Sequence, residues 1–205
     1  MRSKSKPSNP KTAAQMAVRA QFGAISSAWK NLTESARSAW RESASNFPYI
    51  NRLGDSKILS GFALHQKLNT NLDLIGESAL TFPPEPITPV NFSSIAVTAF
   101  KPAEGPDVMN ILAPLVTSDP NVKTLIFATP PLSAGVENFE NKLRLIGFKL
   151  ASSFASEFDV NDMYESVFGE LPVGAKVGVR VQNVSSESGM ASSPFYATAI
   201  KELKS

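Results

Sequence analysis

The chain has 205 residues, of which 42% are hydrophobic, and a formal net charge of +2. It contains no cysteine, which excludes disulfides, thiolate catalysis and Cys-ligated metal sites. No apolar run approaches the roughly 20 residues that a membrane-spanning helix needs. No apolar stretch follows the basic N-terminus as it would in a secretory signal. We therefore expect a soluble chain that is made in the cytoplasm and carries no ordinary export signal.

The positive charge is concentrated at the front of the chain. Residues 1–33 contain no acidic residue and six basic ones: Arg2, Lys4, Lys6, Lys11, Arg19 and Lys30. Partners of such a segment are acidic protein surfaces, nucleic acid or anionic lipid.

Residues 1–11 (MRSKSKPSNPK) alternate serine with basic residues and include Pro7 and Pro10. This composition predicts an extended basic arm that folds only on a partner, such as a neighbouring subunit. Nucleic acid stays open as a partner, although residues 1–21 contain no aromatic side chain on which a base could stack.

A helical docking segment is predicted for residues 12–79. Thr12 and Gln15 have the spacing of a capping box. They are followed at helical spacing by apolar residues that we assign to one stripe: Met16, Val18, Phe22, Ile25 and Trp29. A second helix begins after Thr33 and runs to about Ser45, and a third lies between Ser60 and Gly76. Narrow stripes on short helices must be covered by each other, by the rest of the chain or by a partner.

The two tryptophans, Trp29 and Trp40, have two interpretations. They either form a core between helices or anchor a partner, since Trp and Arg are favoured at interface centres. As candidate partner-binding residues we take the basic and large aromatic residues of the front segment: Arg2, Lys4, Lys6, Lys11, Arg19, Phe22, Trp29 and Trp40.

The remainder of the chain changes from helical to alternating patterning. Residues 80–90 contain four prolines and predict a semi-rigid linker. In the domain over residues 91–205, strands are predicted at 95–99, 107–116, 122–129, 142–152, 175–184 and 194–202, with a short helix within 159–169. The predicted fold class is α+β: a basic arm and short helices, then an antiparallel β-sandwich with one inserted helix.

Two resemblances narrow this expectation. The stretch from Leu171-Pro-Val-Gly174 to Ser192-Ser-Pro194 resembles the last hairpin of a fibronectin type III domain. It implies a fibronectin-like or immunoglobulin-like sandwich, although Val177 stands where that family usually has tyrosine.

The front segment is similar to a pattern in structural proteins of bacteriophages and prophages. The matching residues are Asn9 to Arg19, Phe22, Trp29, Leu32-Thr33, Arg37, Ala39-Trp40, Asn46-Phe47, Leu59 to Phe62 and Leu68-Asn69. The resemblance implies a structural or assembly component of a tailed-phage virion, associated with the capsid, neck or tail. Its partners would be capsid, portal or tail subunits, and it would be present in several copies.

The sequence nominates no catalytic residue, cofactor or metal ligand, so we expect a protein that is not an enzyme. His65 is the only histidine and is interpreted as a packing or surface residue. Asp159, Asp162 and Glu165 could present oxygens to a metal, but an acidic helix start explains them equally well. The alternative function is an adhesive or carbohydrate-binding module, with Tyr164, Phe195 and Tyr196 as the aromatic candidates.

Overall fold

The computed structural model describes residues 11–204 except 52, 114–118 and 154–156. The chain forms two compact units. The N-terminal unit holds the described residues up to Thr70 together with Ala79–Pro83, and the C-terminal unit holds Asn71–Ser78 and the described residues from Pro84 onward. One of the passages between the units lies at Pro83 and Pro84, within the predicted linker.

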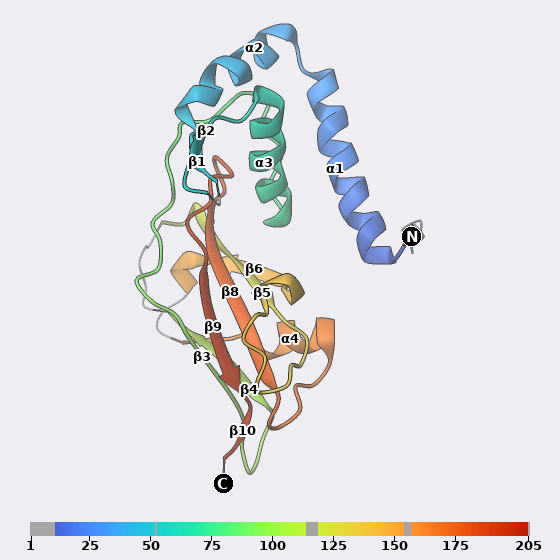
Figure 1. The fold of residues 1–205 in the computed structure, drawn as a ribbon, viewed down its shortest axis with the longest axis vertical. Helices are drawn as coiled ribbons and strands as arrows, with labels where there is room; N and C mark the ends of the chain where they lie inside the picture. Colours follow the sequence, from blue (N-terminus) through green and yellow to red (C-terminus); the bar gives the residue numbers. More distant parts are fainter. Residues whose placement is uncertain (1–10, 52, 114–118, 154–156, 205) are drawn as a thin grey trace, which may run out of the picture. The chain divides into compact units, whose positions relative to one another are not determined.

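Three α-helices occur in the first 75 residues of the described chain: α1 (Ala13–Asn31), α2 (Glu34–Ser43) and α3 (Gly61–Leu74). Figure 1 shows α2 lying across the adjacent ends of α1 and α3. The hydroxyl of Thr12 accepts the Gln15 N–H and that of Thr33 accepts the Ala36 N–H, which satisfies free donors of each first turn. The predicted helix starts are confirmed.

The interior of the N-terminal unit forms where α2 meets α3. Its buried side chains include Ala36, Trp40, Leu64, His65 and Leu68. The end of α2 differs from the prediction, because the chain continues from Ala44 to Asn46 as a 3-10 helix. A small antiparallel hairpin of β1 (Tyr49–Ile50) and β2 (Ser56–Lys57) follows, and the sequence did not predict it.

The C-terminal unit contains two four-stranded sheets, ordered β10-β3-β4-β7 and β6-β5-β8-β9. Their strands are β3 (Ala96–Lys101), β4 (Val108–Leu112), β5 (Val122–Ala128), β6 (Arg144–Leu150), β7 (Glu157–Asp159), β8 (Lys176–Ser185), β9 (Phe195–Ile200) and β10 (Glu202–Leu203). All neighbouring pairs are antiparallel except β10 with β3. The predicted inserted helix is α4 (Asn161–Phe168), and it ends at Gly169 with φ of 78°, a value that favours glycine.

One buried cluster draws residues from both sheets. The alternating residues Val177, Val179 and Val181 of β8 belong to it, as do Ile111 of β4 and Tyr164 of α4. The fold is therefore mixed α and β with antiparallel sheets, as the alternation of the sequence predicted. The finer assignment to a fibronectin-like or immunoglobulin-like sandwich stays a prediction.

Two strand predictions need correction. Strand β7 was missed because it has three residues and depends on pairing with β4. The predicted strand over 194–202 divides into β9 and β10 at Lys201. The buried Lys201 ammonium pairs with the Asp107 carboxylate and donates to the Leu171 carbonyl at 2.6 Å. The Lys201 backbone also bonds to Ala175 and Gly174, so a buried ion pair and backbone hydrogen bonds together hold the point where β9 gives way to β10.

Within the described part of the chain, no helix combines the length and the hydropathy that crossing a membrane requires.

Candidate docking surface

The apolar stripe of α1 follows from helix geometry. At about 100° per residue, Val18, Phe22, Ile25 and Trp29 lie within roughly 60° of one another around the helix axis. Met16, which the sequence interpretation placed in the same stripe, lies on nearly the opposite side. The stripe therefore consists of four residues that extend along most of α1.

The C-terminal half of the stripe is covered by α3. Ile25 is buried, and the ring of Trp29 makes edge-to-face contacts with Phe62 and His65 at centroid distances of 5.7 and 5.3 Å. The Gln66 amide of α3 donates to the Phe22 carbonyl at 3.2 Å and lies 3.3 Å from the Ser26 hydroxyl. These contacts fix the C-terminal half of α1 on α3.

The N-terminal half of the stripe is uncovered. Val18 is 64% exposed and Phe22 is 56% exposed. Burying a side chain of this size stabilises a protein by about 1.5–3 kcal/mol, so two such residues in line with a buried stripe favour a partner. Arg19 is also exposed and lies beside Phe22 at a spacing of three residues. We call Val18, Arg19 and Phe22 the α1 surface.

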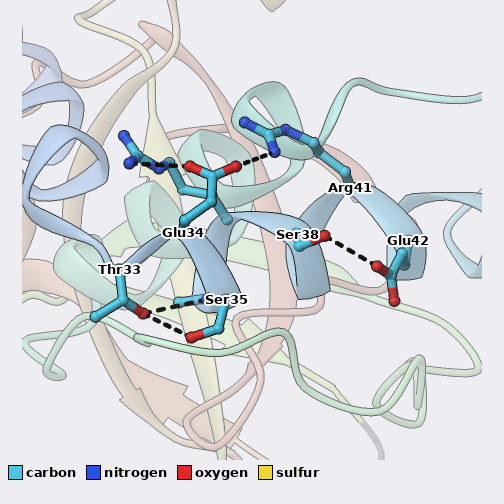
Figure 2. Close-up of polar contacts among 8 residues, drawn as sticks. Thr33, Glu34, Ser35, Ser38, Arg41 and Glu42 are labelled. Carbon is cyan, nitrogen blue, oxygen red and sulfur yellow. Dashed lines mark hydrogen bonds and ion pairs between the residues drawn. The ribbon is translucent and has the colours of Figure 1, made fainter.

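The first acidic residue of the chain, Glu34, is engaged within α2 (Figure 2). One of its carboxylate oxygens accepts from Arg41 at 2.7 Å, and the other lies 3.0 Å from Arg37. The hydrogen bond from Arg41 is the main reason why the pKa of the Glu34 carboxyl is lowered below its usual value. The acid nearest in sequence to α1 is thus already paired with two arginines.

The predicted partner-binding residues separate into four groups. Lys11, Arg19 and Phe22 are exposed, and Trp29 is half-buried against α3. Trp40 is fully buried, and its indole N–H donates to the Thr81 carbonyl at 2.9 Å, so it is a core residue and not part of a docking surface. Arg2, Lys4 and Lys6 lie outside the described residues.

His65 is a packing residue. It is buried, and its ring makes edge-to-face contacts with Trp29 and Trp40. Burial lowers the pKa of its imidazole below the usual value, because the charged form would lose its hydration.

Two of the acidic residues around α4 form local hydrogen bonds with Asn161, the first residue of the helix. The Asp159 carboxylate accepts the Asn161 N–H at 2.8 Å, and Glu165 accepts from the Asn161 side-chain amide at 2.9 Å. Across the described residues, no three His, Cys, Asp or Glu side chains come together as a metal site would require.

The aromatic candidates of the C-terminal unit have different surroundings. Tyr164 is fully buried, and its burial raises its pKa to about 12. Phe195 is half-buried against the core cluster. Tyr196 is 40% exposed, and its ring lies 6.4 Å from that of Phe139 in an edge-to-face arrangement. Sequence reasoning missed Phe139, because it lies in an irregular segment far from Tyr196 in sequence.

No family model matches the chain, and searches of curated proteins and of solved structures found no match.

Proposed function

We propose that this protein is a non-enzymatic structural or assembly component of a tailed-phage particle, associated with the capsid, neck or tail. It binds neighbouring subunits through the α1 surface and the basic arm. The observation that carries the proposal is the exposure of Val18 and Phe22 in line with the buried Ile25. A helix whose apolar stripe is only half covered within its own chain is suited to pack its remaining apolar residues on another protein.

Charge complementarity favours an acidic protein as the neighbour. No acid occurs in residues 1–33, while Arg19 is exposed beside the uncovered half of the stripe and Lys11 is exposed just before α1. Apolar contacts at Val18 and Phe22 would supply affinity, and the basic side chains would steer association and select the partner. The resemblance of the front segment to phage structural proteins supports a virion as the place of assembly.

The test is mass spectrometry of purified particles from the source that encodes the chain. We expect peptides of the protein at a constant ratio to the major capsid protein through successive purification steps. Loss of the protein during purification, while the capsid protein is retained, would exclude a structural role in the particle.

A further inference from the structure

An aromatic and acidic hollow lies on the C-terminal unit, away from the core cluster. Its volume is about 470 Å³, and it is lined by Glu137, Asn138, Phe139, Glu140 and Tyr196. The two aromatic rings form an edge-to-face pair. Glu137 and Glu140 are exposed, and neither forms an ion pair with any described residue. The hollow thus combines aromatic surface with two carboxylates free to meet cations.

The segment that carries the hollow is held in place by contacts with β8. Before it, the chain is bridged to β8 by paired hydrogen bonds between Leu132 and Lys176. The Lys176 ammonium also donates to the Val136 carbonyl at 2.8 Å. The Phe139 ring lies directly on Gly178 of β8, where a β-carbon would overlap it. Because position 178 has no side chain, the Phe139 ring can lie on β8 there and face Tyr196. The hollow is therefore formed before any ligand binds.

The aromatic and acidic residues that line the hollow are complementary to the prolines and lysines of the chain's own basic arm. Residues 6–11 read Lys-Pro-Ser-Asn-Pro-Lys. In a polyproline II helix, with three residues per turn, Pro7 and Pro10 lie on one edge, and Lys6 and Lys11 lie on the two flanking edges. Aromatic-lined grooves bind such Pro-x-x-Pro segments because the proline rings stack on aromatic surface and little conformational entropy is lost.

We propose that residues 6–11 of one copy of this protein bind in the Phe139–Tyr196 hollow of a second copy. The two prolines contact the aromatic pair, and the two lysines face Glu137 and Glu140. This inference rests on the proposed assembly function and names a partner for the arm. It connects copies head to tail, since the arm and the hollow are different surfaces of the same chain.

Binding of a labelled peptide tests the proposal. The peptide comprises residues 1–12, and its fluorescence anisotropy is measured against the full-length protein carrying Pro7→Ala and Pro10→Ala, so that the acceptor's own arm does not compete. We expect saturable binding that weakens as salt is added, because the lysine–glutamate contacts are exposed. A peptide with the same two Pro→Ala changes should bind about tenfold more weakly.

Matched acceptor variants locate the site. Tyr196→Ala should weaken binding about tenfold, whereas Tyr49→Ala, at an exposed tyrosine of the N-terminal unit, should leave it unchanged. Glu137→Gln with Glu140→Gln should reduce both the affinity and its salt dependence, and Glu104→Gln should change neither. Equal binding by all acceptors, or no binding at peptide concentrations on the order of 1 mM, would refute the inference.

Two further measurements separate the alternatives. Sedimentation velocity should show concentration-dependent association of the wild-type protein that Tyr196→Ala removes; an arm bound within its own chain would show none and would contradict exchange between copies. The same acceptors are titrated with cellohexaose and chitohexaose. Sugar binding that depends on Tyr196, without peptide binding, would make the hollow a carbohydrate site and would overturn the proposal.

The result of the peptide-binding experiments can be separated from the result of the particle mass spectrometry that tests the proposed function. If the peptide does not bind but the protein is a constant component of purified particles, the arm inference fails and the assembly function stands. If the peptide binds at Tyr196 but the protein is absent from particles, the self-association stands and the virion role fails.

Discussion

At the scale of single residues, His65 links pH to the stability of the N-terminal unit. Burial lowers its pKa in the folded chain, while in the unfolded chain the imidazole titrates near its usual value of about 6.5. Below that pH the unfolded state binds a proton that the folded state excludes. The neutral, buried His65 therefore contributes fully to the stability of the folded state above about pH 6.5. This contribution is lost as the pH falls through the lowered pKa.

Urea unfolding followed by tryptophan fluorescence measures this effect. The only two tryptophans of the chain, Trp29 and Trp40, both lie in the N-terminal unit, so the fluorescence reports that unit. We expect the unfolding free energy to fall between pH 7 and pH 5 with a slope of up to about 1.4 kcal/mol per pH unit. His65→Phe keeps an aromatic ring between the tryptophans and should flatten the profile. An unchanged profile would show that His65 is not its cause.

At the scale of elements, the crossing of α2 and α3 depends on Gly61. A β-carbon at this position would lie 2.7 Å from the Arg41 backbone nitrogen and 2.9 Å from the Trp40 carbonyl carbon. Backbone atoms inside a helix cannot move away as a flexible side chain can. Gly61→Ala should therefore lower the unfolding free energy of the N-terminal unit by about 1–3 kcal/mol, the usual cost of overpacking.

Gly23 provides the matched control for that substitution. It lies inside α1, and nothing would lie within 4 Å of an added β-carbon. Gly23→Ala should raise the unfolding free energy by about 0.5–1 kcal/mol, because alanine favours the helix. Urea unfolding of both variants checks the pair. Equal stability of the Gly61→Ala and Gly23→Ala variants would show that the close approach of α2 and α3 does not require glycine at position 61.

The elements also show which features the sequence determines locally. The starts of α1 and α2 were predictable because Thr12 and Thr33 satisfy the first turns with their own hydroxyl groups. Most strands were predictable from alternation, since β8 buries every second residue along its inner face. The short strands β1, β2 and β7 were not, because two or three residues carry no period and exist only through pairing with distant segments.

The candidate sites were predictable only in part, for a related reason. The apolar stripe of α1 was visible in the sequence, but which half of it α3 covers depends on tertiary packing. Phe139 acquires its place only through contact with Gly178, some forty residues later in the chain. Trp40 looks like an interface anchor in sequence and is a core residue in the structure. The sequence indicates which residue types could form a site, but the packing of the folded chain determines which of them are exposed.

At the scale of the whole molecule, the chain combines buried cores with one helix, α1, whose apolar stripe is covered over only half of its length. The C-terminal unit buries its own core cluster, and α2 and α3 bury Trp40 and Leu68 between them. The α1 stripe passes from the buried Ile25 to the exposed Phe22 and Val18 along one helix face. The central claim of the proposed function is that this exposed half, Val18 and Phe22, completes its burial on a neighbouring subunit.

Incorporation of variants into particles tests that claim most directly. The wild-type protein, Val18→Ser with Phe22→Ser, and the control Met16→Ser are each supplied in place of the native chain, and their ratio to the capsid protein is quantified by mass spectrometry. Met16 is 51% exposed and lies on the other side of α1, and exposed substitutions change folding stability by only about 0.5 kcal/mol. We predict that the double variant is at least about tenfold depleted and that Met16→Ser is incorporated normally. Normal incorporation of the double variant would contradict docking through α1.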